Sequence, residues 1–443
     1  MEKTKNSNYN KDSSSSKYSY SVLKIFILSF VGILIFFIPI KLNNQVETVI
    51  YHISYYLENE LSSFIDMSLV FFVALGTLKG IFEKEKSVSS NIALFLRVFS
   101  IVILVSFIFK KEELFIGDDR LIFIMRDLIT NIVILLPVCA VFLPLLLDYG
   151  LIEIVEAYTH KIMKKSFKVS GKVFLNFLIY FFVDNICGVF VTYRLYKDGK
   201  LREREACITI LNFSILSFSL TSDLCNKINI STLKFFIMEM ITLILCNIII
   251  CRMYPLKKKK QSYFIKSGYK DINCKKNKMK VAIKKHLNIS KNKKFISYSF
   301  SYLNEVIYIF MDLIPNIIFI FFLANIIFNV PLFNDNLTNL TNTLFLFFKL
   351  PNSQEIAQIS NFTFFNSILG IKAIPKDTYY FTKLVLSLII TLQCISICFL
   401  IPFIRKTIIP LDLKEIFLVC IERYIIIISI CYISYSLYLK YLL

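Results

Sequence analysis

The sequence predicts an all-α fold: a polytopic transmembrane helical bundle with two inverted repeats and two re-entrant hairpins. Hydrophobic residues make up 56% of the 443 residues, and the mean hydropathy is +0.63. These residues gather in separate runs of roughly twenty, and a helix of that length crosses a hydrocarbon layer of about 30 Å. Basic residues concentrate in alternate connections, and three short motifs recur in the second half.

Nine uninterrupted apolar runs are predicted to cross the membrane. Residues 1–21 are polar and rich in Ser, Asn and Lys, and we predict a disordered cytoplasmic tail. Three helices then follow within residues 22–110. The first is long for a signal peptide and lacks a small-residue cleavage site, so we interpret it as an uncleaved helix. The nine runs are Val22–Ile40, Phe64–Phe82, Ile92–Phe109, Leu128–Leu147, Ala206–Thr221, Thr232–Tyr254, Val306–Val330, Tyr379–Ile401 and Ile416–Leu439.

Two further apolar stretches, around Val173–Val191 and Ile356–Ile371, each contain a central polar break. If both turn back on themselves, the basic connections all lie on the N-terminal side, and the acidic connection 110–125 lies on the other. The positive-inside rule then favours two re-entrant hairpins and a cytoplasmic N-terminus. We expect a multi-pass protein of the bacterial cytoplasmic (inner) membrane.

The segment 257–300 is predicted to be a basic cytoplasmic loop. Between Lys257 and Lys294 it carries fifteen lysines and a single acidic residue, Asp271. Such a block is typical of a solvated, poorly ordered loop beside anionic lipid head groups, which we expect as its partner together with the lipid bilayer. Nucleic-acid binding would rest on charge alone, and we expect no nucleic-acid partner.

The chain also resembles itself, which predicts a first repeat over residues 126–256 and a second over residues 303–443. Asp127 would begin its helix at the outer face and Asp312 at the inner face, so the repeats are predicted to have inverted topology, as in many secondary transporters. The recurring motifs are RDLITNIVI (Arg126–Ile134) with MDLIPNIIF (Met311–Phe319), FFVDNICG (Phe181–Gly188) with FFNSILG (Phe364–Gly370), and TLKFF (Thr232–Phe236) with DLKEIF (Asp412–Phe417).

The candidate substrate-binding residues lie at the two polar breaks and on the helix after the first. Polar groups inside a membrane segment normally face a cavity or a partner. Hydroxyls and amides both donate and accept, which suits a neutral solute such as a nucleobase or ribose. Alternatively, these side chains only bond between helices. They are Asp184, Asn185, Gly188, Asn212, Ser214, Ser217, Asn366 and Gly370.

Enzyme motifs do not occur in the sequence. It has no GxSxG, no HExxH, no phosphate-binding glycine loop and no dinucleotide fingerprint. We therefore predict that the protein is not an enzyme, and we expect no catalytic residue, cofactor or metal.

Three segments resemble the YjiH family, bacterial inner-membrane proteins that carry the nucleoside recognition, or Gate, domain. The resemblance covers roughly residues 25 to 440 and rests on an Asp-x-Gly-Leu helix end, a Tyr-x-x-Gly with Arg-Glu-Ala, and a Phe-Ser-x-x-Ser helix. It implies that the first repeat is a Gate-like domain that handles nucleosides. The matching residues are Asp148, Gly150 and Leu151; Tyr196, Gly199, Arg204, Glu205 and Ala206; and Phe213, Ser214 and Ser217.

Two functions follow as hypotheses. The first is a transporter or permease-like protein for a nucleoside, nucleobase or similar small polar solute, because paired polar breaks in inverted halves are typical of secondary transporters. The second is a non-transporting membrane scaffold or partner protein, like the spore-maturation Gate proteins. No oligomeric state is predicted.

Overall fold

The computed structural model describes most of the chain. The predicted tail, residues 1–21, lies outside the described residues. Within them the chain is almost entirely helical, as predicted, apart from one short β-hairpin. The described residues are 22–42, 45–82, 88–108, 119–265, 271–272, 277–289, 294–348, 350, 352–375, 379–393, 395–398 and 400–442.

The N-terminal region consists of helices around a β-hairpin. The first helix ends at Phe37, earlier than predicted, because the ring of Pro39 disfavours helical backbone at the residue before it. Pro39 then pairs with Thr48 in the antiparallel hairpin. The elements are the helix Val22–Phe37, β1 (Pro39–Leu42), β2 (Gln45–Thr48), α2 (Val49–Glu60), α3 (Ser62–Phe82) and α4 (Val88–Ile108).

The middle of the chain forms a series of mostly short helices, and two of its apolar stretches are interrupted by extended residues. The elements are α5 (Asp119–Phe142), α6 (Pro144–Leu147), α7 (Leu151–Phe167), α8 (Lys172–Phe182), α9 (Asn185–Lys197), α10 (Glu203–Phe213), α11 (Phe218–Lys227), α12 (Thr232–Ile250) and a 3-10 turn, η2 (Leu256–Lys258).

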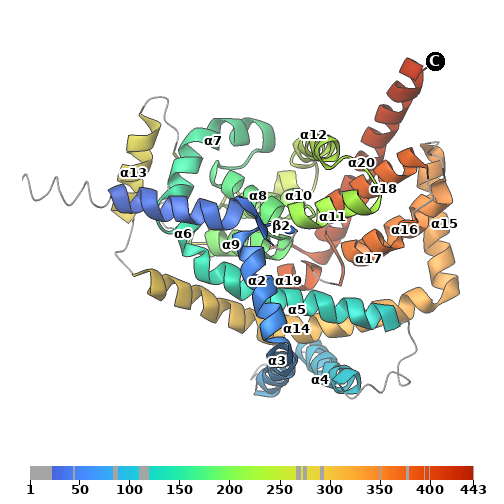
Figure 1. Cartoon of the computed structure of the whole chain (residues 1–443), viewed down its shortest axis with the longest axis horizontal. Helices are drawn as coiled ribbons and strands as arrows, with labels where there is room; N and C mark the ends of the chain where they lie inside the picture. The colour runs from blue at the N-terminus through green and yellow to red at the C-terminus, as the bar shows by residue number, and fades with distance from the viewer. Residues whose placement is uncertain are drawn as a thin grey trace, which may run out of the picture.

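The last part of the chain has a similar order of elements, again with two interrupted apolar stretches. Its last helix projects from the body of the molecule at its C-terminal end (Figure 1). The elements are α13 (Lys278–Ile289), α14 (Phe295–Asn329), α15 (Pro331–Phe347), α16 (Ser353–Phe365), α17 (Ser367–Ala373), α18 (Tyr380–Leu392), α19 (Leu400–Lys406) and α20 (Leu413–Leu442).

The two long helices α5 and α14 pack side by side across the molecule (Figure 1). Near the start of α14 the Ser299 hydroxyl donates to the carbonyl oxygen of Val141, at the end of α5, over 2.7 Å. The two helices therefore run antiparallel. Each contains one internal proline, Pro137 in α5 and Pro315 in α14.

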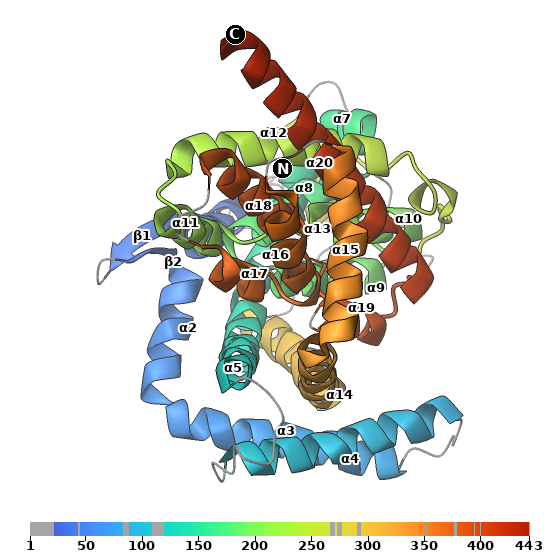
Figure 2. The same cartoon turned by 90° about the vertical axis from the view of Figure 1, so that its right-hand side faces the viewer.

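The helices α3 and α4 cross this pair at a steep angle and lie along one side of the molecule (Figure 2). A charge cluster fixes them to α14: Asp312 pairs with Arg97 of α4 at 3.0 Å and with Lys79 of α3 at 2.7 Å. Asp312 was predicted to begin its helix, but it lies well inside α14, because the apolar segment before it is helical as well. Together with Lys406 of α19 at 3.8 Å, these cations offset the cost of burying its charge there.

Four helical stretches among the described residues are long and apolar enough to cross a membrane. Six further apolar helices have 10–17 described residues. The prediction of a helical chain built for a membrane is confirmed at this level, with fewer full-length helices than the nine predicted runs. The four stretches are Glu203–Lys227, Thr232–Ile250, Phe295–Ala324 and Leu413–Ser434.

Part of the basic loop is ordered, contrary to the prediction of a poorly ordered segment. Helix α13 packs against α7, with Ala282 fully buried beside Ala157. Lys285 of α13 pairs with Glu156 of α7 at 3.3 Å. The lysine content predicts a solvated loop, whereas the buried carboxylate of Glu156 in α7 pairs with part of the segment.

Candidate functional site

The first polar break is the turn between α8 and α9, which pack side by side. The Asn176 amide donates to the Thr192 hydroxyl over 2.6 Å, and a Cβ at Gly188 would lie 2.5 Å from the Tyr180 ring. Both contacts join residues equally far before and after Asp184. The chain therefore folds back at Asp184, and Gly188 is needed because the Tyr180 ring occupies the space of a side chain.

Asp184 is the N-cap of α9. Its backbone is extended, with φ −166° and ψ 157°, and its Oδ1 accepts from the backbone N–H of Ile186 at 2.8 Å. The first amides of a helix have no partner within the helix, and a capping oxygen satisfies one of them. The sequence pattern predicts that Asp184 binds a solute. In the structure, one of its two carboxylate oxygens caps α9.

Asn366 has the same place in the second break, between α16 and α17. Its backbone is also extended, with φ −159° and ψ 133°, and its Oδ1 accepts from the backbone N–H of Ile368 at 2.7 Å. Gly370 follows it by four residues, as Gly188 follows Asp184, and a Cβ there would lie 2.5 Å from the Thr363 hydroxyl. The two breaks are built alike.

The helix after the first break is itself interrupted. Instead of the continuous span that was predicted over Ala206–Thr221, α10 ends at Phe213 and α11 begins at Phe218, with extended residues between them. In this segment the backbone N–H of Ile215 donates to Asn185 Oδ1 over 3.1 Å. The Asn185 side chain therefore links the segment between α10 and α11 to the first break. The sequence pattern predicts a solute-binding role for this residue.

The helix after the second break is interrupted in the same way, between α18 and α19. The backbone N–H groups of Ile397 and Cys398 donate to the carbonyl oxygens of Phe364 and Phe365, over 3.0 and 3.3 Å. These two carbonyl groups belong to the last turn of α16, directly before Asn366. Each interrupted helix is thus tied to the fold-back of its own half.

A backbone hydrogen bond joins the two halves: Leu216 N–H donates to Thr391 O over 2.9 Å. The second part of each interrupted helix also contacts the fold-back of the other half. Lys227 of α11 donates to Ile371 O of α17 over 2.6 Å, and α19 packs on α9. We call the residues that this network connects the break junction. It comprises Asp184–Asn185, Ser214–Ser217, Phe364–Asn366, Thr391 and residues 395–398.

Arg423 of α20 stabilises the interruption after α10 and was not identified as a site residue from the sequence. Its side chain is fully buried, and its Nη1 and Nη2 donate to Leu211 O and Ser214 O over 2.6 and 2.7 Å. The last carbonyl groups of a helix have no partner within the helix and carry partial negative charge. A buried guanidinium supplies both the donors and the opposite charge.

The predicted site residues after the first break lie in two environments. Ser214 and Ser217 lie in the interruption itself, and both are buried. The Ser214 hydroxyl has no hydrogen-bond partner among the described residues. Asn212 instead faces α12, where its amide donates to Asn247 O over 3.3 Å. The structure therefore separates Asn212 from the two serines.

The N-terminal region reaches the break junction at Ser217, which lies near Tyr51 of α2. Next to it, the Ser219 hydroxyl at the start of α11 donates to the carboxylate of Glu47, in β2. No sequence pattern pointed to Tyr51, because it precedes the repeats and lies in a short polar helix.

The cytoplasmic end predicted for the first fold-back holds a buried charge cluster. Lys172, at the start of α8, is fully buried and pairs with Asp271 at 3.2 Å and Glu156 at 3.5 Å. Burial raises the pKa of Asp271, but the charges of Lys172 and Arg202 outweigh it and hold this pKa below its ordinary value. The cluster ties the basic loop to the fold-back.

A solvent-open hollow at the start of α16 does not involve the break junction. None of the predicted site residues line it, and no group of three or more potential metal-ligating side chains occurs among the described residues. The side chains that line the hollow are those of Asn352, Ser353, Gln354, Glu355 and Gln358.

Comparison with known proteins does not assign the chain to a family. No family model matches the chain, and no solved structure matches it. An uncharacterized protein of Alkalihalophilus pseudofirmus is 25% identical over 128 residues, which are 28% of this chain and 28% of that protein. The match thus spans less than a third of the relative's length.

Proposed function

We propose that this chain is a transporter or permease-like protein for a nucleoside, nucleobase or similar small polar solute. The observation that carries the proposal is the break junction, in which each fold-back is bonded to an interrupted helix and the two interrupted helices are bonded to each other, from Leu216 N–H to Thr391 O. Transporters place interrupted helices from two halves around a central site, where the unpaired backbone and polar groups bind the solute.

The order and direction of the elements support an inverted repeat with two re-entrant hairpins. A long helix with an internal proline begins each half, α5 or α14, and a further helix, a fold-back, an interrupted helix and a last helix follow. The first helices run antiparallel, as Ser299 and Val141 indicate. Halves of opposite direction give inward-open and outward-open states of similar energy.

The chemistry of the junction favours a neutral solute that both donates and accepts hydrogen bonds. The Ser214 hydroxyl is buried and has no partner among the described residues, and Ser217 lies beside it under Tyr51. The second oxygen of Asp184 adds an acceptor. A ribose or nucleobase presents the complementary hydroxyl, amide and ring nitrogen groups. The resemblance to the nucleoside recognition family points to the same class of solute.

Equilibrium binding tests the site. Purified protein in detergent would be titrated with tritiated uridine and adenosine, comparing Ser214→Ala with Ser387→Ala. Ser387 is a matched control, since it is equally buried but its hydroxyl already donates to Lys383 O over 2.7 Å. We expect Ser214→Ala to weaken binding about fivefold or more, the value of a lost hydrogen bond of about 1 kcal/mol, and Ser387→Ala to leave it unchanged. Equal effects would refute the assignment.

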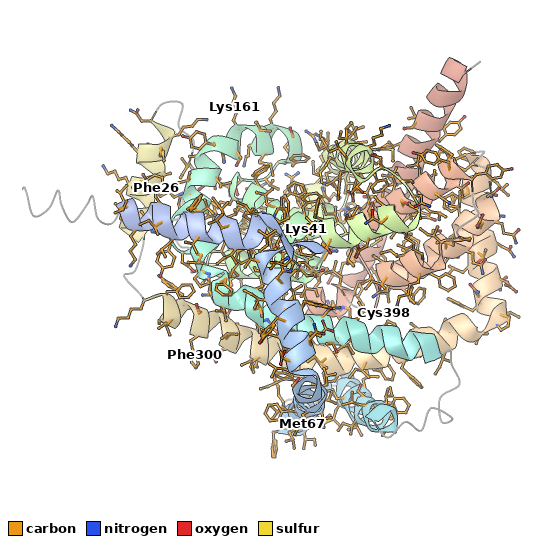
Figure 3. All side chains as sticks on the ribbon, in the orientation of Figure 1. Phe26, Lys41, Met67, Lys161, Phe300 and Cys398 are labelled. Carbon is orange, nitrogen blue, oxygen red and sulfur yellow. The ribbon has the colours of Figure 1, made fainter. Side chains whose placement is uncertain are left out.

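We further propose a bacterial inner-membrane location with a cytoplasmic N-terminus. Lysines of α7 and α13 support it by forming one basic end, where Lys161 points outward (Figure 3). Anionic lipid head groups would meet this end. In cells, we expect a maleimide that does not cross membranes to label Asn336→Cys on α15 but not Lys161→Cys until the cells are opened. The reverse pattern would overturn the orientation.

A non-transporting scaffold is the second candidate, and one observation favours it. Helices α3 and α4 lie along the side of the molecule and expose large apolar side chains, including Met67, Phe71, Phe82 and Phe95 (Figures 2 and 3). A membrane partner would cover such a face. The scaffold predicts a co-purifying membrane protein that is lost when Phe71 and Phe95 are changed to Ser, and no solute binding.

A further inference from the structure

Glu239 is an acidic side chain inside a potential membrane-crossing helix. It lies in α12, within Thr232–Ile250, and is fully buried. Among the described residues neither of its carboxylate oxygens has a hydrogen-bond donor, and no Lys, Arg or His lies within 4.0 Å. An ionised carboxylate in such a place is expensive because nothing replaces its hydration.

The groups around Glu239 offer it no positive charge. Thr391, in the last turn of α18, faces the carboxyl group, and Cys225 of α11 is the nearby titratable side chain. The charged groups on the other packed elements are engaged elsewhere or lie toward other ends of these elements. They include Arg423 of α20, which donates to α10; Lys383, two turns before Thr391; Glu203 and Glu205 at the start of α10; Arg252, just after α12, which donates to Lys165 O and Ser166 O of α7; the exposed Asp223 and Lys227 of α11; and Glu415 and Glu422 of α20, the first of which pairs with Lys259.

The end of α18 also disfavours a negative charge. Its last carbonyl groups carry partial negative charge, so an ionised Glu239 would be repelled, whereas a protonated carboxyl group is itself a donor. Arg423 provides the contrast, because it places a permanent cation at the end of α10. The end of α10 thus meets a cation, Arg423 of α20, whereas the end of α18 meets an acid, Glu239 of α12.

We propose that Glu239 is a proton-binding site that controls the break junction. While Thr391 O of α18 accepts the Leu216 N–H, as in this structure, the Glu239 carboxyl group carries a proton. When the junction opens and water reaches the carboxyl group, its O–H bond breaks, the proton passes to water, and the carboxylate becomes hydrated. Coupling of this proton to solute movement rests on the proposed function, but proton binding itself does not.

Infrared spectroscopy of the protein in lipid nanodiscs, labelled with ¹³C-glutamate, tests the site directly. We expect a protonated-carboxyl C=O band at pH 7 in the wild type that shifts with the label. This band should be lost in Glu239→Gln and kept in Glu60→Gln, an exposed control. Absence of the band from the wild type, or its persistence in Glu239→Gln, would overturn the proposal.

A second variant keeps the test decisive if Glu239→Gln does not fold. Thr391→Val replaces a hydroxyl near the carboxyl group with a methyl group and makes its surroundings less polar, so the same band should move to higher frequency, and an unchanged band would count against the site. Uridine separates the two proposals. If uridine does not bind but the band is present, the proposed function fails while the proton site stands; if uridine binds and the band is absent, the reverse holds.

Discussion

Asp184 and Asn366 occupy equivalent positions in the two halves of the chain. Each is an extended residue at the turn of a fold-back, and each uses Oδ1 to accept the backbone N–H two residues later, at 2.8 Å from Ile186 and 2.7 Å from Ile368. A carboxylate and an amide thus serve the same capping purpose. Only the charge distinguishes them, so capping and solute binding can be tested separately.

Replacing Asp184 with Asn should preserve the cap, whereas Asp184→Ala should remove it. We expect Asp184→Ala to lower the stability by about 1 kcal/mol and Asp184→Asn to change it little, because asparagine caps helices as well as aspartate does. Thermal unfolding in detergent measures this. If both variants unfold equally early, the charge of Asp184, rather than its hydrogen bond, stabilises the turn.

Arg423→Met should destabilise the protein strongly. It leaves Leu211 O and Ser214 O buried without their donors, and losing such a buried charge-assisted pair costs about 2–5 kcal/mol. The matched control is Arg405→Met on α19, where the arginine is exposed. Thermal midpoints that fall equally in both variants would contradict the role of Arg423 at the interruption.

Lys172→Met should also be strongly destabilising, because Glu156 and Asp271 lose the fully buried cation that they share, at a cost of about 3–5 kcal/mol. Changing Glu156 to Gln in the same protein should recover part of the loss. Lys161→Met, at an exposed position of α7, serves as the control. A double variant no more stable than Lys172→Met would show that the two side chains act independently.

The stability of the protein should fall as the pH is lowered from about 7.5 to 5.5, and His160 should contribute to the fall. Burial lowers the pKa of His160 below its ordinary value. The unfolded chain therefore takes up this proton first, as the pH falls through about 6.5, and protonation favours unfolding. Above that pH the residue contributes nothing. The fall should be smaller in His160→Gln than in His52→Gln, and equal falls would exclude His160.

The sequence made the two fold-backs predictable. Asp184 and Asn366 are polar residues within apolar runs, each followed four residues later by a glycine, and this local pattern marks a turn. Glu205 shows the same kind of local control, because its carboxylate in the first turn of α10 accepts the Arg202 backbone N–H over 3.1 Å. Short-range chemistry decides these features, so sequence is sufficient.

The interruption at Ser214–Ser217 was not predictable in this way. The segment contains neither glycine nor proline, and the helix ends there because Arg423, more than two hundred residues later, satisfies its carbonyl groups. Thr391 and Tyr51 likewise reach the junction only through tertiary packing. The order of α13 depends on Glu156 of α7, which the lysine count does not reveal.

Uptake of labelled uridine and adenosine into liposomes that contain the purified protein tests the central claim most directly. We predict saturable accumulation above that of empty liposomes, reduced by Ser214→Ala and unchanged by Ser387→Ala. Failure of the folded, correctly inserted protein to accumulate either nucleoside, or nucleobases supplied in their place, would contradict the transport account and favour the scaffold.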